Sequence, residues 1–142
     1  MEKKETKQLL IVNYSSSPGP RYCNQGDDSG EDFYHKVLNA SFYKAISSNC
    51  LLEVVLDGTD GYASSFLDEA FGNLVYDFGE TVVRSTLLLK SDEEPEWIDM
   101  LENSTFKEWE NRRKESKAPN ITGNHSDWYR LIDGNFVNKK WL

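Results

Sequence analysis

The sequence predicts a small α/β domain: a sheet flanked by helices in βαβαβα order, with a C-terminal helix and a β-hairpin extension. Aliphatic segments of strand length alternate with segments of helical periodicity, which is typical of parallel strands joined by helices. The 142 residues suffice for one hydrophobic core. We place the α/β domain at residues 1–116 and the extension at residues 117–142.

The first half of the domain contains two predicted strands and one helix. The first strand is expected at residues 8–14, where an apolar run precedes a Ser- and Pro-rich loop. The first helix is expected at residues 30–48, with Ser29 and Asp32 as a capping box. The second strand, residues 51–57, is rich in aliphatic side chains, which is typical of a strand buried on both faces.

The second half is predicted to continue the alternation. Apolar residues from Phe66 to Phe78 recur at helical spacing, with Ser65 and Asp68 as a second capping box and Gly79 at the end. A third strand is expected at residues 81–90, and a third helix starts at residues 91–95 and ends in the charged run 107–117.

The extension is predicted to form a hairpin from residues 128–132 and 135–141 around the turn Asp133-Gly134. It contains many aromatic residues for its length, so we expect these to pack on the domain or on a partner. They are Trp128, Tyr129, Phe136 and Trp141.

The amino-acid composition and net charge limit the kinds of partner and the cellular location that we expect for this protein. The formal charge of −8 disfavours nucleic acid and anionic membranes as partners and favours a basic protein surface. The apolar run of residues 9–12 is too short for a signal peptide or a membrane span. Cys23 and Cys50 lack the spacing of a zinc or redox motif, so we expect free thiols and a cytoplasmic location.

Two loops are expected to face one another. Since the carboxyl ends of parallel strands meet at one edge of a sheet, residues 15–31, with Arg21, should lie beside residues 57–65. The second loop carries Asp57, Asp60, Ser64 and Ser65. In open α/β sheets this edge is the usual place for ligands.

The residues of this edge admit more than one chemistry. Arg21 is expected either to clamp a carboxylate or phosphate opposite Asp57 and Asp60, or to pair with one of them and stiffen its loop. Those aspartates with Asp68 also suggest magnesium, but turn formation at Gly58 and Gly61 and capping by Asp68 explain them more simply. We therefore predict no metal and no cofactor.

Catalysis is not indicated by the sequence. The two histidines, His35 in the first helix and His125 in the extension, have no motif neighbours, and His35 is expected on the helix surface. There is no G-x-S-x-G motif and no P-loop. We therefore predict a protein that is not an enzyme.

Two blocks carry a resemblance to a known family. PGPRYCNQGDDSGEDF (residues 18–33) and LDGTDGYASSFLDEAFGNLV (residues 56–75) resemble the STAS-like family of unknown function, related to sulphate-transporter and anti-sigma-factor-antagonist domains. The resemblance covers about residues 8–92. It implies a STAS-type α/β fold and protein–protein signalling, with a histidine-kinase-like ATPase or an anti-sigma-type switch kinase as a partner.

In the antagonist proteins, a serine at the start of a helix is phosphorylated in an Asp-Ser-Ser-Gly setting. The corresponding stretch here, residues 63–66, has the serines Ser64 and Ser65 without that aspartate and glycine. The serines are therefore either a phosphorylation switch or ordinary helix caps.

We expect a non-catalytic regulatory or adaptor protein that binds a protein partner through this edge. The alternative is a small-molecule or nucleotide-binding enzyme component of a phage or defence locus. The predicted binding residues are Arg21, Tyr22, Ser29, Asp57, Asp60, Ser64 and Ser65.

Overall fold

A computed structural model describes residues 4–138 and contains a three-stranded parallel sheet. Its strands are β1 (Thr6–Leu10), β2 (Leu51–Val55) and β3 (Leu87–Lys90), in the order β1-β2-β3. In this register, Gln8 pairs with Glu53 and Glu53 with Leu88. The expected parallel pairing of the first two strands is confirmed.

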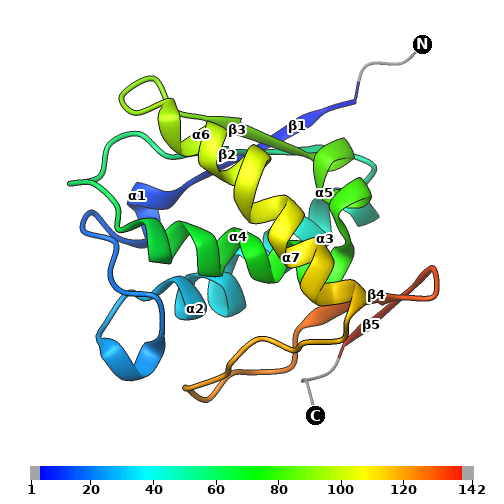
Figure 1. The fold of residues 1–142 in the computed structure, drawn as a ribbon. Coiled ribbons are helices and arrows are strands. Elements are labelled where there is room, and N and C mark those ends of the chain that lie inside the picture. Colours follow the sequence, from blue (N-terminus) through cyan, green and yellow to red (C-terminus); the bar gives the residue numbers. More distant parts are fainter. Residues whose placement is uncertain (1–3, 139–142) are drawn as a thin grey trace.

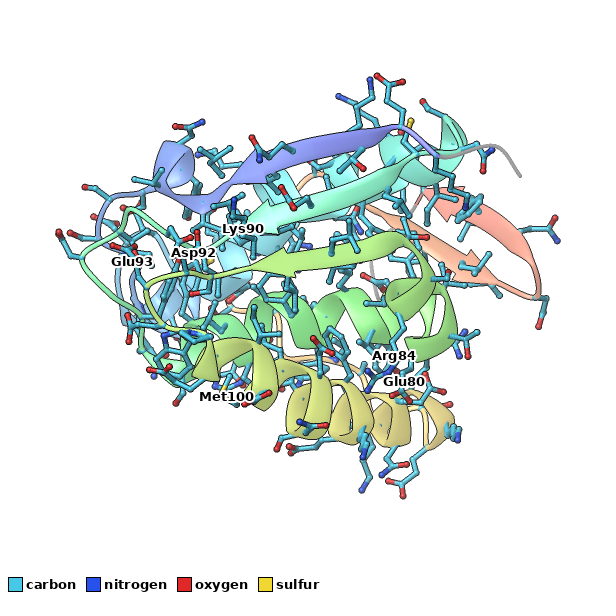
Figure 2. The ribbon with its side chains drawn as sticks, turned by 90° about the horizontal axis from the view of Figure 1, so that it is seen from above. Glu80, Arg84, Lys90, Asp92, Glu93 and Met100 are labelled. Atoms are coloured by element: carbon cyan, nitrogen blue, oxygen red, sulfur yellow. The ribbon has the colours of Figure 1, made fainter. Side chains whose placement is uncertain are left out.

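The strands are connected by helices that lie on one face of the sheet (Figures 1 and 2). The first connection is one continuous helical segment formed by α2 (Gly30–Phe33), the π-helical η2 (Tyr34–Leu38) and α3 (Asn39–Ser47). The second consists of α4 (Ser64–Phe78) and α5 (Glu80–Thr86). Right-handed crossovers that advance in one direction across a sheet lie on the same side of it.

The opposite face of the sheet is therefore not covered by these helices, and the expectation that residues 51–57 are buried on both faces is wrong. On that face the Gln8 side-chain amide donates to Glu53 Oε1 (2.9 Å), and Leu88 is 41% exposed. The inward face of β2 carries the buried Leu52 and Val54. The apolar composition of β2 did not distinguish one buried face from two.

Two predicted strands are shorter than expected. Residues after Leu10 form the helical turn α1 (Ile11–Tyr14), and α5 occupies most of the predicted third strand. The pairing of β1 with β2 ends at Leu10, opposite Val55. The pairing of β2 with β3 begins at Leu87, opposite Leu52. Backbone without a neighbouring strand satisfies its hydrogen bonds locally, as the Ser15 N–H does by donating to the Ile11 carbonyl (3.0 Å).

The C-terminal helical segment packs across α4 (Figure 1). It comprises α6 (Glu96–Met100), the π-helical η3 (Leu101–Thr105) and α7 (Phe106–Lys114). Its expected apolar face is buried at Leu101, Phe106 and Trp109. A Cβ built on Gly72 of α4 would lie 2.1 Å from Trp109 Cε2, so the helices approach closely because residue 72 is glycine.

The predicted C-terminal hairpin is confirmed, with strands β4 (Tyr129–Ile132) and β5 (Asn135–Asn138). Both turn residues have positive φ, 51° at Asp133 and 78° at Gly134, as a type I′ turn requires. Trp128 is 2% exposed, and the Tyr129 ring stacks on Tyr43 with centroids 3.7 Å apart. Within residues 4–138, the extension therefore packs on the domain, as expected; Trp141 lies outside them.

No helix among the described residues has the length and apolar character needed to cross a membrane. The division at residue 116 stays a prediction.

Candidate functional site

The loops that follow the three parallel strands meet at one edge of the sheet, which we call the rim (residues 15–29, 56–63 and 91–95). The Asp60 N–H donates to the Ser16 carbonyl (2.7 Å). The Asp57 carboxylate accepts from the backbone N–H groups of Asp92 (3.0 Å) and Glu93 (2.9 Å). The first and second loops therefore face one another, as the strand order predicted, and the third loop joins them.

Arg21 does not lie opposite Asp57 and Asp60. Its Nη1 donates to Asp68 Oδ2 (2.8 Å) and to Glu69 Oε1 (3.0 Å), both on the first turns of α4. The expectations that Arg21 clamps a ligand opposite Asp57 and Asp60, or pairs with one of them, are therefore wrong. Its carboxylate partners are Asp68 and Glu69 instead. The cause is tight packing of its loop on α4.

Gly30 shows how tight that packing is. A Cβ built on Gly30 would lie 2.4 Å from the Phe66 carbonyl oxygen. The chain before Gly30 is thereby drawn along α4. The Glu69 side chain is 1% exposed, and its burial raises its pKa although Arg21 and Asn73 donate to it. Arg21 thus compensates buried negative charge.

Asp57 and Asp60 hold the rim loops together. The N–H groups of residues 92 and 93 lower the pKa of Asp57 by stabilising its carboxylate. Asp60 accepts a hydrogen bond from the Ser17 hydroxyl. Asp68 lies away from both and also accepts from Thr105 Oγ1 (3.0 Å). The three aspartates do not form the grouping considered for magnesium.

Ser64 and Ser65 begin α4, but neither caps it. The N-cap residue is Ala63, and no side chain caps the helix, so the predicted Ser65/Asp68 capping box is wrong. Asp68 is engaged by Arg21 and Thr105 instead. Ser64 is exposed and Ser65 is half-buried. Gly79 ends the helix with φ 90°, as expected.

Ser29 and Tyr22 have structural contacts. Ser29 is fully buried, and its hydroxyl accepts from the Asp32 N–H (3.0 Å), which confirms it as a helix cap. The Tyr22 hydroxyl accepts from the Asn120 side-chain amide (3.3 Å). Ser29 is therefore not presented to a partner.

The rim is acidic and shallow. Asp60, Asp92 and Glu93 are exposed there, and Figure 2 shows the latter two where β3 ends. A pocket of about 80 Å³ lies between the second and third loops. Small-molecule sites commonly have volumes of about 300–1,000 Å³, so this hollow does not fit a nucleotide.

Residues 29–97 match the family model described as a STAS-like domain of unknown function. The resemblance stated from the sequence is confirmed over this segment, which includes the block 56–75 and excludes residues 18–28 of the other block. A search of curated proteins and a search of solved structures gave no match.

A second polar cluster joins the STAS-like domain to the segments outside it. Glu31, in α2, is fully buried and accepts five hydrogen bonds. Its Oε1 accepts from the Cys23 N–H (3.0 Å), and its Oε2 lies 2.7 Å from His125 Nε2. The remaining donors are the Thr122 hydroxyl and the N–H groups of Thr122 and Gly123. These bonds lower the pKa of Glu31 to about 2 despite its burial.

His35 borders this cluster and is not the surface residue that the sequence indicated. Its ring stacks on His125, with centroids 4.2 Å apart, and contacts Trp128 edge-on. Burial lowers the pKa of His35 to about 3, so the ring is neutral. The sequence did not single out Glu31 or its contacts with residues 122–125, since no local motif marks these long-range contacts.

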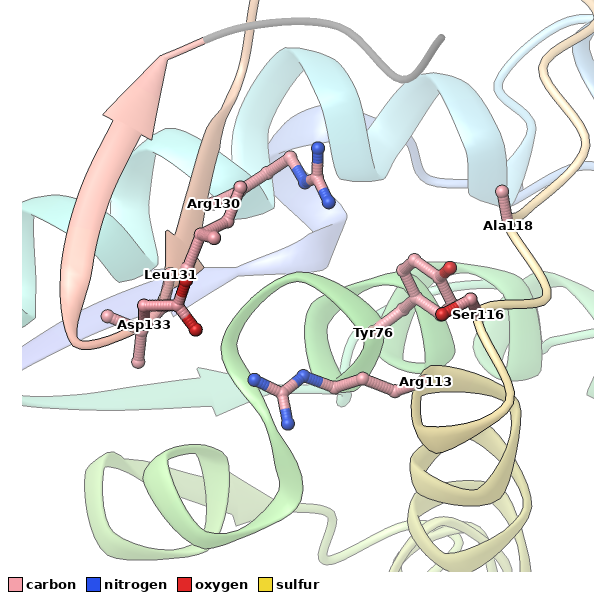
Figure 3. A pocket seen from close by; sticks show the side chains of 8 residues that line it. Tyr76, Arg113, Ser116, Ala118, Arg130, Leu131 and Asp133 are labelled. Carbon is pink, nitrogen blue, oxygen red and sulfur yellow. The ribbon is translucent and has the colours of Figure 1, made fainter.

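An open pocket of about 460 Å³ lies at the other end of α4, between α7 and β4 (Figure 3). Tyr76, Arg113 and Arg130 line it. Arg113 lies 3.7 Å from Glu110, and Arg130 lies 3.5 Å from the buried Asp77. Carboxylates thus already neighbour both cations.

Proposed function

We propose that this protein is a non-catalytic regulatory or adaptor protein that binds a protein partner through the rim of its STAS-like domain. The proposal rests mainly on one observation: the three rim loops are hydrogen-bonded to one another and form one acidic surface. Hydrogen bonds between the loops hold the surface in place before binding, which lowers the entropy cost of association.

The charge of the rim supports a partner with a basic surface. Asp60, Asp92 and Glu93 present carboxylates to solvent, and the whole chain carries −8. Complementary charge raises the rate of encounter and discriminates against acidic partners. The family resemblance favours a histidine-kinase-like ATPase or an anti-sigma-type switch kinase as this partner.

Ser64 is the proposed point of control. It is exposed at the start of α4 and beside the acidic rim, whereas Ser65 is half-buried. A phosphate there is favoured by the helix N-terminus. It also changes the charge and shape that a partner meets.

The alternative, a small-molecule or nucleotide-binding enzyme component, receives less support from the rim. The hollow there is about 80 Å³ and is lined by Asp57, Asp60, Glu93 and Glu94. Carboxylates repel phosphate groups. The cytoplasmic location remains part of the proposal on the basis of two free thiols, Cys23 and Cys50.

Affinity capture from the native host, with charge-reversed variants as bait, tests the proposed surface. The rim variant carries Asp60→Lys and Asp92→Lys. The control carries Glu102→Lys and Glu108→Lys, which make the same charge change at exposed positions of η3 and α7. We expect the control to recover the wild-type partner and the rim variant to lose it; equal recovery by both variants would remove the rim from the role.

A matched serine pair tests the control point. Ser64→Glu should recover less partner than Ser64→Ala, whereas Ser104→Glu, at an exposed position of η3, should behave as wild type. Equal recovery with Ser64→Glu and Ser64→Ala would show that added charge at this position does not control binding.

A further inference from the structure

Three side chains of different types converge at the first turn of α2, each from a separate part of the chain. Cys23 lies in the short 3₁₀ turn η1 (Cys23–Gln25), Glu31 in α2, and His125 in the segment before β4. One ligand atom from each lies within 4.8 Å of the others. Long-range folding therefore assembles a thiol, a carboxylate and an imidazole that the sequence spacing did not reveal.

The distances suit a transition-metal ion with small adjustments. Zinc lies about 2.0–2.3 Å from nitrogen, oxygen and sulfur ligands, so ligand atoms around one tetrahedral ion are about 3–4 Å apart. His125 Nε2 and Glu31 Oε2 are 2.7 Å apart, and Cys23 Sγ lies within 4.8 Å of one ring nitrogen of His125 and one carboxylate oxygen of Glu31. Shifts of about 1 Å bring the three atoms to coordinating positions.

The surroundings hold these side chains in place. The Glu31 carboxylate is fixed by N–H groups of Cys23, Thr122 and Gly123, which belong to the two segments that carry the other ligands. Gly123 allows close approach, because a Cβ there would lie 3.0 Å from Cys23 Sγ. The His125 ring stacks on His35. Such supporting contacts orient the ligands of metal sites in proteins.

We propose that Cys23, Glu31 and His125 form a zinc-binding site that clamps the N-terminal loop and the C-terminal extension onto the STAS-like domain. The donor set of sulfur, nitrogen and oxygen selects zinc or cobalt over magnesium and calcium, which bind oxygen. Three protein ligands leave a fourth position for water. Cys23 is partly exposed, so an ion has a route to the thiol.

Zinc binding requires each of the three ligands to offer a lone pair that is free of a proton. The Cys23 thiol releases its proton to solvent and binds as a thiolate, while Glu31 binds as the carboxylate it already is. His125 binds as the imidazole whose proton is on Nδ1, which leaves the Nε2 lone pair for the ion.

Titration of the full chain with Co²⁺, followed by displacement with Zn²⁺, tests the site. A thiolate ligand gives Co²⁺ a charge-transfer band in the near ultraviolet. Wild type should show this band at one ion per chain, and Zn²⁺ should abolish it. Cys23→Ser should lose the band, and His125→Gln should weaken cobalt binding more than about tenfold.

Cys50→Ser is the matched control, because Cys50 is the other thiol and lies buried before β2 with its Sγ 3.4 Å from the Ser48 carbonyl oxygen. This variant should keep the band and the wild-type affinity. Circular dichroism establishes that each variant is folded. A wild-type chain without the band, or a band that survives in Cys23→Ser and disappears in Cys50→Ser, would overturn the proposal.

Discussion

At the scale of single residues, the structure turns an expected binding residue into a stabilising one. Arg21 lies between Asp68 and Glu69, and its side chain is 28% exposed while that of Glu69 is 1% exposed. Removing one partner of a buried ion pair leaves an uncompensated charge, whereas exposed pairs contribute little. Arg21 was recognisable from the sequence as important, but its partners follow from the packing of Gly30 on α4.

Arg21→Ala should lower the free energy of unfolding by about 2 kcal/mol, since Glu69 then keeps its burial without its cation. Arg84→Ala is the control. It removes an i,i+4 pair with Glu80 in which the arginine side chain is 37% exposed, so about 0.5 kcal/mol is expected. Urea unfolding of both variants measures the difference, and an equal loss would contradict the role given to Arg21.

Tyr62 gives a prediction for pH dependence. Its hydroxyl donates to the Leu56 carbonyl (2.6 Å) within the rim, and burial raises its pKa to about 12. The pKa of Tyr62 in the folded protein exceeds the unfolded value of about 10. The protonated hydroxyl therefore contributes its full stabilisation to the free energy of unfolding below pH 10, and this stabilisation is lost as pH rises towards 12.

Tyr62→Phe should therefore be less stable than wild type by about 1 kcal/mol at neutral pH, and this gap should shrink between pH 10 and pH 12. Urea unfolding at several pH values measures the gap. A gap that is constant over this range would show that the Tyr62 hydroxyl is not protected in the fold.

At the scale of elements, helical periodicity and turn chemistry were predictable, and strand ends were not. The helix after Ser29 and the Asp133-Gly134 hairpin follow from local signals, and both are confirmed. The strand positions expected after Leu10 and before Leu87 failed because a strand extends only as far as its neighbour. The length over which two strands pair cannot be inferred from the apolar residues of one strand alone.

The contact between α4 and α7 depends on Gly72. Gly72→Ala should destabilise the protein by about 2–3 kcal/mol, because its Cβ would lie 2.1 Å from a ring atom of the buried Trp109. Ser104→Ala, at an exposed helical position, is the control and should change stability by less than about 0.5 kcal/mol. Thermal unfolding compares them; a neutral Gly72→Ala would mean that α7 moves away at little cost.

At the scale of the whole molecule, the extension completes the core that the domain begins. Asn39 accepts from the Tyr129 N–H (2.9 Å) and donates to its carbonyl (2.9 Å), and Glu31 bonds to residues 122–125. The sequence predicted that the aromatic residues of the extension would pack on the domain or on a partner. Which surface of the domain they contact follows only from the assembled fold.

A chain ended after residue 116 should therefore unfold at a lower urea concentration than the full chain, since Glu31 and Asn39 lose these partners. Limited proteolysis should also cut it faster. Unchanged stability would show that the extension is an independent appendage.

Hydrogen exchange in the complex with the captured partner is the sharpest test of whether the rim binds that partner. We expect slowed exchange in residues 56–66 and 91–97, with little change in α7 and the β4–β5 hairpin. Protection confined to α7 or the hairpin, with the rim exchanging as in the free protein, would contradict it.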